Sequence, residues 1–110
     1  MAKKISNTDL AGGTSFHGTC ILCTKSELTN LLGEPTYEQN NGEDKVNVEW
    51  VCETEDGQTF TIYDWKEYRP INDNEEIEWH IGGKSRATTE RAYRELVQAF
   101  DGVSSSGSGH

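Results

Sequence analysis

Apolar and polar side chains alternate along three short runs between residues 45 and 81, and this alternation limits the folds open to the chain. In the first run the apolar positions are Val46, Val48, Trp50 and Cys52. Residues 59–65 and 77–81 repeat the pattern. Successive side chains of a β-strand point to opposite faces, so each run predicts a strand with one apolar face. Asp56-Gly57 is a hairpin signal and residues 70–76 form a second connection, which predicts an antiparallel meander.

The flanking segments add one strand and two helices. Residues 14–23 have strand composition, and a capping box from Thr24 to Glu27 then starts a helix that Gly33 and Pro35 end. A second helix is expected to begin between residues 85 and 89 and to end near Gly102. Its apolar positions follow helical spacing at Tyr93, Leu96, Val97 and Phe100. The predicted fold class is α+β in the order β-α-β-β-β-α, a four-stranded, mainly antiparallel sheet with two helices packed on one face.

A chain of 110 residues is long enough for one domain. We assign residues 14–101 to this domain, residues 1–13 to an irregular N-terminal arm, and residues 102–110 to a disordered linker or tag remnant, because that last segment is almost entirely Gly and Ser. No run approaches the roughly 18 apolar residues that cross a bilayer, and the start lacks the apolar segment of a secretion signal. We therefore expect a cytoplasmic protein.

The acidic residues are concentrated in the middle of the chain. The formal net charge is −9, and residues 27–78 carry 15 Asp and Glu against three Lys and Arg, a local net of −12. Residues 84–100 are locally basic, with four Lys and Arg against two Glu. Such an acidic body repels phosphate backbones, so we expect no nonspecific nucleic-acid binding. Such acidity usually serves solubility alone, and the alternative is docking onto a basic partner surface, including mimicry of DNA.

The strongest metal-binding pattern is His17-x-x-Cys20-x-x-Cys23, with Cys52 and His80 elsewhere. If residues 14–23 form a strand, Cys20 shares a face with Phe16 and Leu22, whereas His17 and Cys23 point to the other face. A zinc site needs converging ligands, which this arrangement does not give. We therefore predict free thiols, with no metal and no cofactor.

The segment Gly82-Gly83-Lys84-Ser85-Arg86 joins the last predicted strand to the second helix. It is not a phosphate-binding P-loop, because Glu78 stands where that motif requires Gly. Backbone amides at the start of the helix, with Lys84, Ser85 and Arg86, could still bind a small anion. The alternative is a flexible Gly-Gly turn that breaks the strand and is followed by an ordinary helix cap.

Aromatic and charged residues gather at the end of the 59–65 strand and on the 77–81 strand. If Phe60 and Ile62 face the core, Tyr63 and Trp65 lie on the opposite face of the sheet. Residues of these types dominate protein interfaces. The candidate binding residues are Tyr63, Asp64, Trp65, Tyr68, Arg69 and His80. The alternative is that the aromatic rings complete the core or pack beneath the N-terminal arm.

Catalytic signatures are weak. His17 and His80 could act as bases and Asp64 as a carboxylate partner, but no nucleophile motif accompanies them. We therefore predict that the chain is not an enzyme and has no catalytic residues.

The strings Thr-Ile-Tyr-Asp-Trp-Lys at 61–66 and Glu-Trp-His-Ile-Gly at 78–82 resemble small uncharacterised proteins of tailed bacteriophages. The resemblance spans residues 14–97 and carries no catalytic signature or site residue with it. It implies a phage accessory protein in a bacterial cytoplasm, and such proteins commonly inhibit, mimic or sequester host components.

The expected function is a non-enzymatic binding module that engages a host protein through Tyr63, Trp65, Tyr68 and Arg69. The first alternative is a sequestering protein for a small, nucleotide-like anion, bound between the aromatic face and residues 84–86. A less favoured alternative is a small hydrolase or metal enzyme that uses Asp64 and His80. An exposed edge of the residue 14–23 strand would also allow a homodimer.

Overall fold

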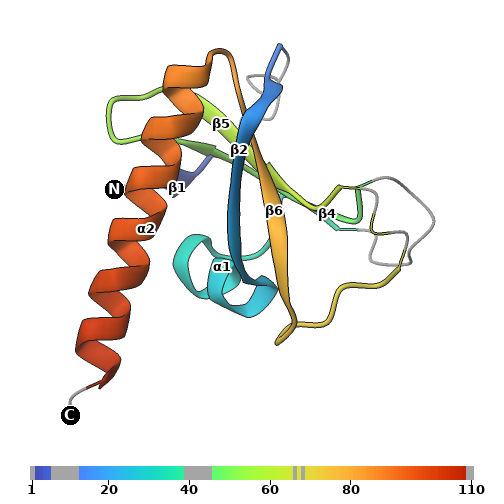
Figure 1. Ribbon diagram of the computed structural model, residues 1–110, viewed down its shortest axis with the longest axis vertical. Helices are drawn as coiled ribbons and strands as arrows, with labels where there is room; N and C mark the ends of the chain where they lie inside the picture. Colours follow the sequence, from blue (N-terminus) through green and yellow to red (C-terminus); the bar gives the residue numbers. More distant parts are fainter. Residues whose placement is uncertain (1, 6–12, 39–45, 66, 68, 109–110) are drawn as a thin grey trace.

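The computed structural model describes residues 2–5, 13–38, 46–65, 67 and 69–108, and it shows an α+β fold with two helices packed on an antiparallel sheet (Figure 1). The two helices are α1 (Lys25–Leu32) and α2 (Arg86–Ser108). The strands are β1 (Lys3–Lys4), β2 (Ser15–Thr24), β3 (Tyr37–Glu38), β4 (Val48–Glu53), β5 (Thr59–Tyr63) and β6 (Glu76–Gly83). Among the described residues, no helix is both long enough and apolar enough to cross a membrane.

The strands lie in the order β1-β4-β5-β6-β2, and β3 also pairs with β4. The predicted α+β class, the four longer strands and the meander of β4, β5 and β6 are confirmed, and β2 takes the edge beside β6. The predicted number of four strands is wrong, since the sheet has six. The two extra strands, β1 and β3, are two residues long each, too short to show any alternation.

Both ends of the chain depart from the predicted boundaries. The strand β1 lies within the segment predicted to be an irregular arm, and it pairs with Glu53 and Cys52 of β4. The helix α2 continues to Ser108, beyond the end predicted at Gly102. A glycine lowers helix stability by about 1 kcal/mol relative to alanine but does not stop a helix as proline does.

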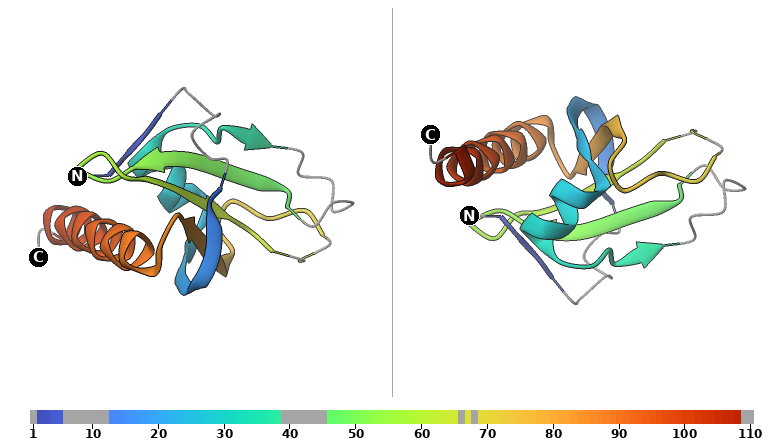
Figure 2. Two further views of the ribbon diagram at one scale, coloured as in Figure 1. Left: turned by 90° about the horizontal axis from the view of Figure 1, so that it is seen from above. Right: turned by 90° about the horizontal axis from the view of Figure 1, so that it is seen from below.

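Alternation places the apolar faces of the strands in one core that both helices help to form. Leu28 and Leu32 of α1 and Ala92 and Leu96 of α2 belong to the same buried cluster as the sheet residues. Eight predicted inward residues of the meander are in this cluster: Val48, Trp50, Cys52, Phe60, Ile62, Ile77, Trp79 and Ile81. Val46, which was predicted to share their face, precedes β4, is only half-buried and is not in the cluster. Figure 2 shows α2 lying along one side of the strands.

The helix α1 begins as its sequence predicts. Thr24 Oγ1 accepts a hydrogen bond from the Glu27 amide at 3.0 Å, and Glu27 Oε1 accepts one from the Thr24 amide at 2.9 Å. The helix ends where Gly33 takes a φ of +90°, a value that favours glycine. The Gly33 carbonyl also accepts a hydrogen bond from Trp50 Nε1 at 2.9 Å, which ties the end of α1 to the centre of the sheet.

The pairing of β2 with β6 contains an irregularity that leaves the side-chain alternation intact. The partners are Phe16 with Gly82 and then Cys20 with His80, so β2 has two extra residues around Gly18, whose φ is +90°. An insertion of two residues does not reverse the faces, because the side-chain period of a strand is also two. The strands β2 and β6 run side by side in Figure 1.

The Asp64 side chain links the end of β5 to the start of β4 by hydrogen bonds. Its side chain is fully buried. Asp64 Oδ1 accepts hydrogen bonds from the backbone amides of Asn47 and Val48 at 2.8 and 2.9 Å, and Oδ2 accepts one from Asn47 Nδ2 at 2.8 Å. The carboxylate is therefore occupied in holding two strands together.

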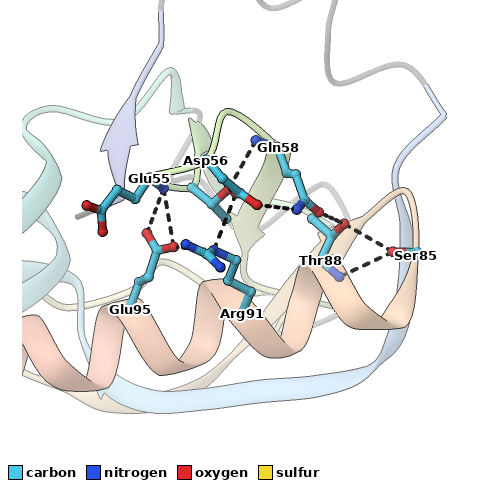
Figure 3. Close-up of polar contacts among 8 residues, drawn as sticks. Glu55, Asp56, Gln58, Ser85, Thr88, Arg91 and Glu95 are labelled. Atoms are coloured by element: carbon cyan, nitrogen blue, oxygen red, sulfur yellow. Dashed lines mark hydrogen bonds and ion pairs between the residues drawn. The ribbon is translucent and has the colours of Figure 1, made fainter.

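A polar network joins the β4–β5 hairpin to α2 (Figure 3). The Glu95 carboxylate accepts the Glu55 amide at 3.0 and 3.2 Å and also receives Arg91 Nε at 2.9 Å. Closer to the start of α2, Thr88 Oγ1 donates to Gln58 Oε1. These contacts fix the orientation of the helix relative to the hairpin, in addition to its apolar packing.

Removing the Asp64 carboxylate should destabilise the fold strongly. In Asp64→Ala, two backbone amides and one side-chain amide lose their acceptor. Each buried unsatisfied donor costs about 1–3 kcal/mol, so we expect the free energy of unfolding to fall by about 3–5 kcal/mol. Urea denaturation followed by tryptophan fluorescence measures the loss. The control Asp73→Ala removes an exposed carboxylate that pairs with Lys25 and should change stability by less than about 1 kcal/mol. Equal losses in the two variants would contradict this role.

Glu95→Gln should loosen the hairpin from α2. The neutral amide oxygen accepts the Glu55 amide less strongly and loses the ion pair with Arg91, which predicts a loss of about 1–2 kcal/mol in unfolding free energy. The matched control is Glu90→Gln, because Glu90 forms an exposed pair with Arg86 on the same helix. Thermal unfolding of both variants tests the difference, and a control that is as unstable as Glu95→Gln would refute it.

Candidate binding face

The face of the sheet opposite the core carries a cluster of four rings, which we call the aromatic cluster: Phe16, Tyr63, Trp65 and His80. His80 stacks on Phe16 with ring centroids 4.2 Å apart and an interplanar angle of 19°. Trp65 is also stacked relative to His80, at 6.3 Å and 28°, and Tyr63 meets His80 edge-on at 5.6 Å. Phe16 lies on β2, Tyr63 on β5 and His80 on β6, and Trp65 is two residues after the end of β5. Only the folded sheet therefore brings the four rings together.

Cross-strand pairing explains why His80 lies at the centre. Tyr63 is its direct partner on β5, and Cys20 is its direct partner on β2. Burial lowers the pKa of His80, and the negative charges of Glu78 and Glu67 act in the opposite direction. The neutral imidazole is therefore favoured, and its orientation is restricted by the flanking rings.

Gly82 leaves the space that the cluster occupies. A Cβ atom at this position would lie 2.7 Å from Thr61 Oγ1 and 3.4 Å from the Tyr63 ring. Real Cβ atoms do not approach an oxygen so closely, so any side chain at residue 82 would displace Thr61 or the ring above it. The absence of a side chain at Gly82 thus lets Tyr63 pack over β6.

Part of this face is open to solvent. Phe16 is 43% exposed, Trp65 is 40% exposed and Leu22, on the same face of β2, is 62% exposed. Large apolar side chains that gather at a surface are typical of recognition sites. Trp65 is therefore not enclosed in the core. This excludes, for Trp65, the alternative that the aromatic rings complete the core.

Carboxylates surround the aromatic cluster. Glu78 lies on β6 two residues before His80 and points to the same face, and Glu49 pairs with Tyr63 across β4 and β5. Glu49 is half-buried, and burial raises the pKa of its carboxyl group. At the described positions of β2, β4, β5 and β6 that point to this face, none of the residues is Lys or Arg. The face is therefore both aromatic and acidic.

The structure brings together three of the six predicted binding residues: Tyr63, Trp65 and His80. The prediction that Asp64 is a binding residue is wrong. Its carboxylate is buried and accepts hydrogen bonds from residues at the start of β4. Arg69 is exposed and pairs with Glu75 at 2.6 Å and with Glu67 at 3.7 Å. Tyr68 lies outside the described residues.

Phe16 belongs to the aromatic cluster but was not predicted. Alternation along β2 does place it on one face with Cys20 and Leu22. Its contact with His80 depends on the pairing register of β2 with β6, including the two extra residues at Gly18. No local pattern indicates that register.

The glycines of the predicted anion site lie inside a strand. Gly82 and Gly83 belong to β6 and pair with both β5 and β2, so the prediction that they break the strand is wrong. Ser85 Oγ accepts the Thr88 amide at 3.2 Å, an ordinary helix cap, and Arg86 pairs with Glu90. Lys84 is exposed beside a shallow pocket lined by Gly57, Gln58, Thr59 and Thr88. Anion binding there stays a prediction.

The structure groups three metal-ligating side chains that the sequence pattern did not pair. Cys20, Glu78 and His80 bring one sulfur, one carboxylate oxygen and one ring nitrogen within 4.8 Å of one another. Cys23 lies in the core, so the prediction that Cys20 and Cys23 point to opposite faces is confirmed. His17 Nε2 donates to the Gly83 carbonyl at 3.1 Å, on the side of β2 that faces away from this group.

Only Cys20 should react with a thiol reagent in the native protein. The thiolate is the reactive form, and burial raises the pKa of Cys23 and of Cys52 to about 12. Cys20 is half-buried, and its pKa is raised by burial and then by Glu78. A disulfide reagent such as Ellman's should modify one thiol natively and three in denaturant, and Cys20→Ser should abolish the native reaction. Glu78→Gln should accelerate it, and native modification of two or more thiols at one rate would contradict this ranking.

Comparisons of the chain with protein family models, with curated proteins and with solved structures found no match. We therefore infer function from the aromatic cluster, the carboxylates around it and the Cys20, Glu78 and His80 group.

Proposed function

We propose that this chain is a non-enzymatic binding module whose aromatic cluster and surrounding carboxylates bind a protein partner that presents Lys or Arg side chains. The observation that carries the proposal is the exposure of Phe16 and Trp65 on either side of His80. These are large, rigid side chains held in place by the sheet before any partner arrives.

Pre-organisation makes such a surface an effective anchor. Aromatic side chains in a fixed orientation lose little conformational entropy on binding, and interface energies are dominated by a few such residues. Phe16 and Trp65 are each stacked relative to His80, and Tyr63 supports Trp65 edge-on at 6.2 Å. The partner would therefore meet a formed surface.

Charge complementarity defines the chemistry of the partner. Glu49 and Glu78 lie beside the rings, and neither Lys nor Arg occupies the described positions of β2, β4, β5 and β6 that point to this face. Lys3 of β1 also points to this face, where it pairs with Glu53 at 3.4 Å. A cation over an aromatic ring next to a carboxylate gains from both interactions. The net charge of −9 would steer a basic surface toward the module.

From the resemblance of residues 61–66 and 78–82 to small phage proteins, we further propose that the partner is a protein of the bacterial host. Inhibition or sequestration of a basic host surface would follow from occupying it. The alternative of a small nucleotide-like anion has less support, because an acidic face repels anions and Gly82 and Gly83 are integrated in β6.

Trp65→Ala should weaken partner binding strongly while the fold remains intact. The tagged wild-type protein is first used to retain proteins from bacterial lysate at low salt in the presence of a chelator. The retained protein is then purified, and its dissociation constants for the wild type and for Trp65→Ala are measured. Loss of an anchoring aromatic residue costs about 2 kcal/mol or more, which is roughly a 30-fold weaker dissociation constant. Phe16→Ala should act in the same direction, and added salt should weaken the wild-type complex.

The matched control is Tyr93→Ala, because Tyr93 is an equally exposed aromatic residue, at 40%, but lies on α2. It should bind the partner as the wild type does. The proposal fails if the retained protein binds Trp65→Ala and Phe16→Ala undiminished, if Tyr93→Ala weakens binding as much, or if no basic protein is retained at low salt.

A further inference from the structure

The group of Cys20, Glu78 and His80 is assembled by the pairing of two neighbouring strands. Cys20 of β2 lies directly opposite His80 of β6. Glu78 is two residues before His80, so it emerges on the same face of β6 and sits diagonally across from Cys20. The three candidate ligand atoms lie within 4.8 Å of one another.

We propose that Cys20, Glu78 and His80 bind one divalent metal ion of the zinc class, with a fourth position open to solvent. One thiolate, one carboxylate and one imidazole form a ligand set that zinc accepts, and three protein ligands with one open position are typical of reactive or exchangeable zinc sites. Together with Zn²⁺, a thiolate and a carboxylate give a locally neutral assembly.

The distances suit such an ion after small side-chain rotations. In a tetrahedral zinc site the ligand atoms lie about 3.3–3.6 Å apart, given bond lengths near 2.0–2.3 Å. The present spacing of at most 4.8 Å closes to this range through rotation of the exposed Glu78 side chain and the half-buried Cys20 side chain. The paired strands hold the three backbone positions, so no rearrangement of the sheet is needed.

The aromatic cluster orients the imidazole. Phe16 and Trp65 are both stacked relative to His80, so the plane of the imidazole is restricted. A histidine ligand whose orientation is fixed by its neighbours loses less entropy on binding a metal. These rings would act as positioning residues for the proposed site.

The electrostatics of the group favour a cation. Two of the three candidate ligands are acidic groups, the Glu78 carboxylate and the Cys20 thiol, and two negative charges at this spacing repel each other when no cation lies between them. A divalent ion there reverses the repulsion, and the thiol proton passes to solvent as the sulfur–metal bond forms. A thiolate ligand selects zinc-class ions over Mg²⁺ and Ca²⁺, which prefer oxygen.

This site differs from the pattern considered in the sequence. His17 bonds to the Gly83 carbonyl on the other side of β2, and Cys23 and Cys52 lie in the core. The proposal does not depend on the proposed protein partner, because the metal is bound by the isolated chain.

Cobalt(II) titration of reduced, chelator-treated protein tests the proposal. Cobalt replaces zinc with the same geometry, and a thiolate ligand gives a sulfur-to-cobalt charge-transfer band in the near ultraviolet. We expect one cobalt per chain, displacement by zinc, and no effect of excess Mg²⁺. Cys20→Ser should abolish the band, and Glu78→Gln and His80→Asn should each weaken binding by about tenfold or more.

Two matched controls use the same residue types outside the group. Glu76→Gln removes an exposed carboxylate from the same strand, and His17→Asn removes a histidine from β2; both should bind cobalt as the wild type does, and circular dichroism verifies that every variant is folded. The proposal is overturned if the wild type gives no charge-transfer band, if the band persists in Cys20→Ser, or if Glu78→Gln and His80→Asn bind as tightly as the controls. Partner binding is measured with a chelator present, so the two proposals can fail separately.

Discussion

The antiparallel pairing of β2 with β6 is the constraint on which the rest of the structure depends. It carries α1, which follows β2 directly, and α2, which follows β6, to the same core. On the other face the same pairing places Phe16 and Cys20 beside His80. A shift of one residue in this register would exchange the two faces of β2, exposing Ile21 and Cys23 and burying Leu22 and Cys20. The core and the candidate site are therefore specified together.

The two faces of the sheet differ in the kinds of side chain that they carry. The core face is a continuous apolar cluster in which Trp50 and Trp79 meet edge-on at 5.5 Å, and each indole donates to a backbone carbonyl, Gly33 and Cys23 respectively. On the opposite face, rings and carboxylates share the surface and part of each ring remains exposed. Packing alone does not require such a mixture, so a role in recognition accounts for it better than a role in stability.

Polar residues within apolar strands have two different roles in this chain. Asp64 and His80 both interrupt apolar runs, and both were candidate site residues on that ground. Asp64 is buried and accepts three N–H groups from the start of β4, so it stabilises the junction of two strands. His80 is half-buried among rings and carboxylates, where it can still meet a ligand. The local sequence is similar in the two cases, and only the neighbours across the sheet distinguish them.

The sequence by itself determined the alternating faces of the strands, the capping box of α1 and the inward positions of Leu96, Val97 and Phe100 on α2, because these features depend on residues close together in the chain. Tyr93, predicted on the same stripe, is 40% exposed. It also separated Cys20 from Cys23, since neighbours three apart on a strand point in opposite directions. The short strands β1 and β3 and the place of Phe16 beside His80 were decided by tertiary structure. The meeting of Cys20 with Glu78 and His80 belongs with them, because it requires a register between segments about 60 residues apart, and the free energy of packing the whole sheet selects that register.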